Sequence, residues 1–226
     1  MAINKVSGEV VWKTEDMLQS YSTPRVATIN GVRQVIFYLC ANLVGASVKD
    51  GKVLWRVSVP FYSDNNAIAT VFENKIYGGS SASREGFLYE IIAEDDGEYF
   101  ANQVYKTKAQ DAPGMATPVL LDGYLYGNIG PWQDSRLKCI EFATGKVAWE
   151  EKGNRDWNSV ILVDGKLLVL LTDGQLLLVD PKPDGYKELA RFQALDGKCW
   201  NAAAFSNGRL FLRSNKEGVC YEMGAK

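Results

Sequence analysis

Short runs of apolar residues, separated by turn residues, recur along the chain and predict an all-β protein. In one example, the apolar runs at residues 160–163 and 167–170 flank the dipeptide Asp164-Gly165. Such dipeptides between apolar runs are strong hairpin signals, because a type I′ turn needs positive φ at both central residues. The equivalent dipeptides are Asn30-Gly31, Glu73-Asn74, Asp122-Gly123 and Asn207-Gly208. The pattern therefore predicts five tight hairpins in regular succession.

A second pattern indicates the architecture, because one five-residue strand motif recurs with nearly constant spacing. The motif is GEVVW at residues 8–12, GKVLW at 51–55 and GKVAW at 145–149. The first two tryptophans are 43 positions apart and the next interval is 94, which is two periods. The skipped copy falls at residues 102–105, where Tyr105 replaces the tryptophan. A repeat of roughly 40–50 residues made of short strands is typical of a β-propeller with one four-stranded antiparallel blade per repeat.

The repeats predict a single β-propeller domain over residues 1–226 with about five blades. Full blades are expected at residues 22–59, 67–108, 116–152 and 159–194, and a fifth blade begins at residue 202 with only three strands. Residues 9–13 are a copy of the strand type that this blade lacks. Two arrangements follow. The N-terminal strand completes the last blade of a small closed ring, or the chain is the C-terminal arc of a seven- or eight-bladed ring.

The amino-acid composition excludes several classes of function and disfavours others. The net charge is −2 with interspersed charges, so nothing indicates nucleic-acid binding. No apolar stretch is long enough to span a membrane, and no signal peptide is recognisable at the start. The absence of histidine excludes histidine-based triads, general bases and metal ligands. The four cysteines form no Cys-x-x-Cys pair, and we expect Cys139 and Cys220, at matching repeat positions, to pack as small apolar side chains on blade faces.

The five-residue strand motif is part of a longer motif, and through this longer motif the chain resembles the pyrroloquinoline-quinone-like propeller family. That motif has Ala, then Asp, Gly and Trp at fixed offsets. Its copies here are Ala2, Asn4, Gly8 and Trp12; Gly45, Ser47, Gly51 and Trp55; and Cys139, Glu141, Gly145 and Trp149. The resemblance is nearest to a non-catalytic branch similar to outer-membrane-assembly propellers. It implies that the glycines form tight turns, that the tryptophans are structural and dock between blades, and that the protein acts in the periplasm or cell envelope of a bacterium.

The same resemblance raises the question of catalysis. Quinone-dependent dehydrogenases of this fold are larger, and they use calcium, a catalytic aspartate and often adjacent cysteines. This chain is shorter and has no adjacent cysteine pair. We therefore expect no enzyme activity, no catalytic or metal-binding residues and no cofactor. The alternative is that the chain is a fragment or relative of a pyrroloquinoline-quinone-dependent dehydrogenase.

The expected function is a scaffold that binds a protein or small ligand at the funnel mouth, where the segments entering the innermost strands converge. Amides and aromatic side chains in these segments are good ligand contacts. The candidate residues are Tyr21, Asn65, Asn66, Met115, Trp157, Asn158, Trp200 and Asn201. The alternative is that Trp157 and Trp200 fill the interfaces between blades and that the asparagines cap turns.

Overall fold

The computed structural model of this chain describes residues 1–14, 17–60, 65–80, 85–131, 134–153 and 159–224. The described residues form antiparallel sheets that follow one another in sequence order, as the propeller prediction requires. Within this part of the chain the helical structure is a single 3-10 turn, η1 (Ala109–Asp111). No helix in the described residues is long and apolar enough to cross a membrane.

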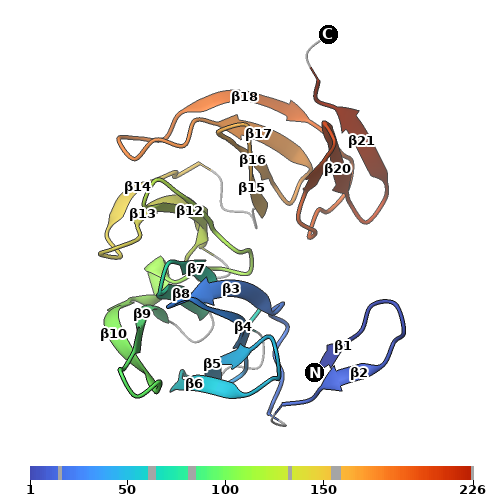
Figure 1. The fold of residues 1–226 in the computed structure, drawn as a ribbon. Coiled ribbons are helices and arrows are strands. Elements are labelled where there is room, and N and C mark those ends of the chain that lie inside the picture. Colours follow the sequence, from blue (N-terminus) through green and yellow to red (C-terminus); the bar gives the residue numbers. More distant parts are fainter. Residues whose placement is uncertain (15–16, 61–64, 81–84, 132–133, 154–158, 225–226) are drawn as a thin grey trace.

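Four sheets have four strands each, and each sheet is one blade (Figure 1). Blade 1 contains β3 (Arg25–Ile29), β4 (Val32–Tyr38), β5 (Asn42–Ser47) and β6 (Val53–Ser58). Blade 2 contains β7 (Thr70–Phe72), β8 (Lys75–Ser80), β9 (Glu85–Ala93) and β10 (Tyr99–Thr107). Blade 3 contains β11 (Val119–Leu121), β12 (Tyr124–Ile129), β13 (Arg136–Glu141) and β14 (Val147–Glu150). Blade 4 contains β15 (Ser159–Val163), β16 (Lys166–Leu170), β17 (Gln175–Val179) and β18 (Glu188–Gln193). These bounds lie within the predicted repeats.

The two ends of the chain form smaller sheets. Blade 5 has three strands, β19 (Ala204–Ser206), β20 (Arg209–Arg213) and β21 (Gly218–Glu222). At the other end, β1 (Ala2–Ile3) pairs with β2 (Val10–Trp12). The pairing of residues 9–13 with 218–223 that a closed ring requires is not formed: β2 pairs with β1, β21 pairs with β20, and the two sheets are separate. The blades lie along an arc with the β1–β2 hairpin at one end and blade 5 at the other (Figure 1).

Four of the five hairpin turns have the predicted positive φ at both central residues, and the Glu73-Asn74 turn has it only at Glu73. Among the described residues, the non-glycine residues with positive φ are the first residues of the five turn dipeptides, with φ between 46° for Asp164 and 54° for Glu73. In four of the dipeptides a glycine follows, also with positive φ. Asparagine, aspartate and glycine tolerate this left-handed region best, so these turns set the register of β-strands on either side.

The hydrophobic core lies between neighbouring blades. The central strand β16 shows how one strand contributes to two interfaces, because its side chains point alternately to the two faces of the sheet. Leu167 and Val169 pack in the cluster shared with blade 3, whereas Leu168 and Leu170 pack in the cluster shared with blade 5. Two further clusters join blade 1 to blade 2 and blade 2 to blade 3. A strand buried on both faces reads as a continuous apolar run, which is the pattern of residues 167–170.

The two matching cysteines differ in their surroundings. Cys139 is buried at the interface of blades 3 and 4, as expected. The expectation is wrong for Cys220, which is exposed. Cys139 packs in the cluster shared by blades 3 and 4. In β21 the neighbours Val219 and Tyr221 pack in the cluster shared with blade 4, so Cys220 lies on the opposite face of blade 5. All four cysteines are described, and none of them forms a disulfide.

The motif tryptophans contact the outer turns in different ways. The Trp12 indole N–H donates to the Val48 carbonyl at 3.0 Å, and the Trp149 indole N–H donates to the Lys182 carbonyl at 2.7 Å. Each carbonyl belongs to the next blade. Tyr105, in the degenerate copy, likewise donates from its hydroxyl to the Phe142 carbonyl of blade 3 at 2.9 Å. Trp55 instead donates within its own blade to Gln34 Oε1 at 2.6 Å.

Candidate functional site

A cavity of about 800 Å³ lies at the centre of the arc, where the segments entering the innermost strands converge. All five blades contribute to its wall. Each contribution comes from the residues just before, or at the start of, β3, β7, β11, β15 and β19. Its size is in the range of small-molecule and peptide sites in proteins.

Five of the eight residues predicted for the funnel mouth line this cavity together, namely Tyr21, Asn66, Met115, Trp200 and Asn201. Trp157 and Asn158 lie outside the described residues. Asn65 is not in the wall. Its side chain is fully buried, and its amide donates to the Leu39 carbonyl at 3.0 Å.

The remaining wall is mostly aliphatic and hydroxylic, and sequence analysis did not identify it. It consists of Thr23, Ile68, Ala116, Thr117, Ser159, Val160, Ile161, Cys199 and Ala202. All nine lie within three positions of a predicted residue. Their place in the repeat could therefore have identified them as candidates for the wall. An isolated aliphatic or hydroxyl side chain carries no such signal by itself.

Hydroxyl groups tie neighbouring blades together around the cavity. Ser22 donates from its hydroxyl to the Ala67 carbonyl of blade 2 at 3.0 Å. Thr117 of blade 3 accepts from the Ile68 backbone N–H of blade 2 at 2.9 Å. Between blades 4 and 5, the Ala203 backbone N–H donates to the hydroxyl of Ser159 at 3.3 Å. These contacts hold the lead-in segments in register, which fixes the cavity wall.

Two large aromatic side chains of the wall are open to solvent. Tyr21 is 75% exposed and Trp200 is 73% exposed. The Lys198 ammonium lies 5.8 Å from the centre of the Trp200 ring, a cation–π contact that occupies one ring face. The high exposure of Trp200 differs from the alternative in which it fills a blade interface. Large exposed aromatic residues in a concave surface are typical anchors for a binding partner.

The cavity wall carries no formal charge in its described part. None of its residues is acidic or basic. The Cys199 thiol adds none at neutral pH, because burial raises its pKa, and nearby Asp173 and Glu217 raise it further. Quinone-dependent dehydrogenases of this fold hold calcium with carboxylate and amide oxygens, and the described part of this wall has amide and hydroxyl oxygens but no carboxylate. The described residues contain no group of three or more histidine, cysteine or acidic side chains that could hold a metal ion.

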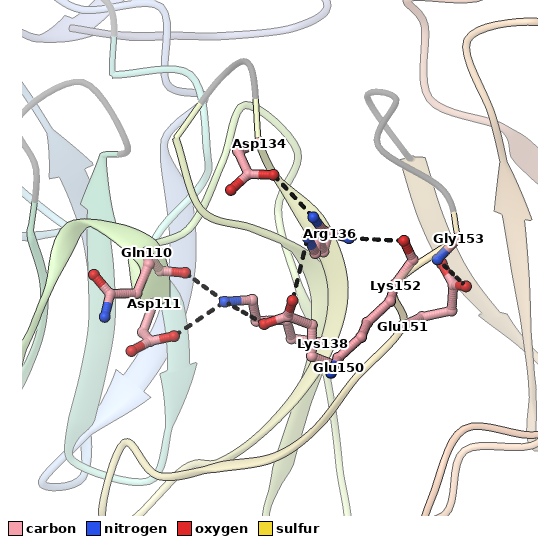
Figure 2. Close-up of polar contacts among 9 residues, drawn as sticks. All are labelled: Gln110, Asp111, Asp134, Arg136, Lys138, Glu150, Glu151, Lys152 and Gly153. Atoms are coloured by element: carbon pink, nitrogen blue, oxygen red, sulfur yellow. Dashed lines mark hydrogen bonds and ion pairs between the residues drawn. The ribbon is translucent and has the colours of Figure 1, made fainter.

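A buried ionic cluster stands behind the blade 3 side of the cavity. Lys138 Nζ lies 3.1 Å from both Asp111 Oδ1 and Glu150 Oε2, and it donates to the Gln110 carbonyl at 2.6 Å. The side chain of Lys138 is 5% exposed, so all three donors are satisfied away from bulk water. Figure 2 shows Lys138 reaching from β13 to the η1 segment, which leads directly into Met115 and the cavity wall.

The same cluster continues through Arg136, one layer closer to solvent. Its guanidinium contacts Asp134 Oδ1 at 3.0 Å and Glu150 Oε1 at 3.2 Å, and it donates to the Lys152 carbonyl at 2.8 Å (Figure 2). Sequence analysis missed this cluster, because its members are far apart along the chain and match no motif. Its position indicates a bracing role for the cavity wall.

Comparisons with known proteins support the fold and the family. The family whose model is described as outer membrane protein assembly factor BamB matches residues 1–150. A search of the curated proteins found no match to the sequence. Among solved structures, the computationally designed Ika8 protein is similar at a TM-score of 0.62 with 10% identity, over 87% of this chain and 57% of that one. Sqt1 of Saccharomyces cerevisiae is similar at a TM-score of 0.59 with 10% identity, over 85% of this chain and 58% of that one.

BamB from Moraxella catarrhalis also matches, with 13% identity and a TM-score of 0.37, over 94% of this chain and 85% of that chain. The chain thus spans little more than half the length of the first two solved proteins that it matches. At such low identity, the likeness to those two shows a propeller fold and nothing further.

Proposed function

The chain belongs to the protein family described as outer membrane protein assembly factor BamB, and from this premise we propose that it is a non-catalytic β-propeller scaffold that binds a protein or small ligand in its central cavity. The observation that carries the proposal is the cavity itself. Segments from all five blades meet there, and their described residues present two exposed aromatic side chains, amides and hydroxyls on a wall without charge. Such a wall is suited to binding rather than to proton transfer or metal chemistry.

We further propose that residues 1–226 act as one propeller domain. The support is that a hydrophobic cluster joins every pair of neighbouring blades from blade 1 to blade 5. In this proposal the motif glycines and tryptophans are structural parts of the blades. From the family's description as an outer membrane protein assembly factor, we propose that this binding role is exercised at the bacterial cell envelope.

The experiment is a capture assay with the purified chain immobilised and a detergent extract of bacterial cell envelopes as the source of partners. A Trp200→Ala, Asn201→Ala double variant should lose a captured protein that the wild-type chain retains. Phe100→Ala is the matched control, because Phe100 is an aromatic residue, 45% exposed, on the outer strand β10. Equal capture by the double variant would contradict binding at the cavity.

A second measurement addresses catalysis. The chain is incubated with pyrroloquinoline quinone, calcium, an electron-accepting dye and a set of alcohols and sugars. We expect no dye reduction above that of the quinone and calcium alone. Turnover that depends on the protein would instead support the dehydrogenase alternative.

A further inference from the structure

We propose that the occupant of the central cavity is an extended, uncharged stretch of polypeptide that carries aromatic or aliphatic side chains. The inference rests on the proposed binding function and names the chemistry of the partner. It derives from three properties of the described wall, which are its lack of charge, its combination of apolar side chains with neutral polar groups, and its exposed aromatic residues.

The lack of charge on the described wall restricts the charge of the ligand. A charged group that entered the cavity would lose its hydration shell and find no counter-charge on the described wall. Lys198 lies over the Trp200 ring, and Asp173 and Glu217 lie near Cys199, but none of the three is part of the wall. The cavity therefore favours neutral ligands over nucleotides, phosphates and acidic or basic peptides.

The balance of polar and apolar groups separates a peptide from a sugar. The larger apolar side chains of the wall, apart from the aromatic ones, come from blades 2, 3 and 4; they are Ile68, Met115, Val160 and Ile161. The many hydroxyls of a saccharide would each need a partner, and buried hydroxyls without one are costly. Apolar peptide side chains gain free energy by burial on such a surface.

The polar groups that remain suit a peptide backbone. Because Thr117 and Ser159 accept hydrogen bonds from the Ile68 and Ala203 N–H groups, each hydroxyl keeps its own proton to donate. Peptide carbonyls recur along an extended chain, with side chains alternating between its two faces. The carbonyls point sideways along the edges of an extended chain, so one edge can meet the hydroxyls while the side chains of one face meet the apolar part of the wall.

The aromatic residues provide the anchors. Tyr21 precedes the first strand of blade 1 and Trp200 precedes the first strand of blade 5, so they belong to the first and the last of the five blades. Both are about three-quarters exposed, and tyrosine and tryptophan are frequent binding hot spots. An extended segment with aromatic side chains near both of its ends can use both anchors.

The test uses fluorescence polarisation with end-capped, dye-labelled heptapeptides and the full chain. The probe has the sequence TFTLTFT, and the matched charged probes are TETLTET and TKTLTKT. We expect TFTLTFT to bind with an affinity that is unchanged between ~50 and ~500 mM salt, because no ion pair contributes. The charged probes should bind at least about tenfold more weakly.

Variants locate the binding. Trp200→Ala and Tyr21→Ala should each weaken TFTLTFT binding by about tenfold, whereas Phe100→Ala should leave it unchanged. Because both residues are exposed, the variants should keep the wild-type melting temperature, which shows that they are folded.

The outcomes distinguish this inference from the proposed function. Preferred binding of a charged peptide, or of maltoheptaose over TFTLTFT, would overturn the peptide chemistry and leave the scaffold function in place. Cavity-dependent capture from the envelope extract without any binding of TFTLTFT would do the same. Absence of both capture and probe binding would overturn both proposals.

Discussion

Replacement of Trp149 by alanine should cost about 3–5 kcal/mol of unfolding free energy. The indole is 9% exposed and lies between Tyr126 and Tyr186, with ring centres 6.0 and 5.7 Å away. A buried tryptophan removes ~150–250 Å² from water, and at ~25 cal/mol per Å² this corresponds to about 4–6 kcal/mol as an upper bound. Part of that area is already buried in the unfolded chain, which brings the estimate into the expected range.

The indole hydrogen bond can be separated from the packing. Trp149→Phe keeps a ring between the two tyrosines but loses the hydrogen bond to the Lys182 carbonyl. We therefore expect it to lower the free energy of unfolding by about 1–2 kcal/mol. Trp12→Ala is the matched comparison, because Trp12 has the same motif position and an equivalent bond to Val48 but is only partly buried. It should cost about half as much as Trp149→Ala.

The measurement is urea unfolding followed by circular dichroism, with the slope of free energy against urea compared among variants. Trp55→Ala should resemble Trp149→Ala, because Trp55 is 3% exposed. Equal losses for Trp12→Ala and Trp149→Ala would show that burial does not set the cost. Equal losses for Trp149→Phe and Trp149→Ala would show that the hydrogen bond, not packing, carries it.

Three further predictions test other parts of the molecule. Lys138→Met should lower stability by about 2–3 kcal/mol in the same assay, because it leaves two partly buried carboxylates without their cation; a stability equal to wild type would contradict the bracing role. Gly45→Ala should lower the melting temperature markedly, because an added Cβ would collide with the buried Trp55 ring; an unchanged melting temperature would refute this close contact. Iodoacetamide at mildly alkaline pH should modify Cys220 rapidly and Cys139 only on unfolding, since burial raises the pKa of Cys139 to about 11. Because that pKa is raised, the contribution of Cys139 to stability is full below its ordinary value near 9 and is lost as pH rises toward 11, which urea titrations across this range would detect.

The sequence determined the blades of this protein. Turn dipeptides such as Asp164-Gly165 impose a backbone geometry that few other residues accept, so hairpin positions are local properties. The alternating and doubly apolar strands between them have one stable solution, stacking of sheets face to face. Residues in the loops that enter the innermost strands could be named as cavity candidates for the same reason, since the repeat places each loop at the same end of its blade.

Tertiary structure alone decided what depends on contacts between distant residues. The cluster around Lys138 joins side chains from η1, β13 and β14, and no sequence spacing encodes it. Trp55 and Trp149 share one motif, yet their indoles bond to a side chain of the same blade and to a carbonyl of the next one. Cys139 and Cys220 share one repeat position, yet one is buried and the other exposed. Burial and pairing depend on which strand and which blade lie beside a residue. A repeating sequence predicts the structure of each blade, but it does not predict what packs against that blade.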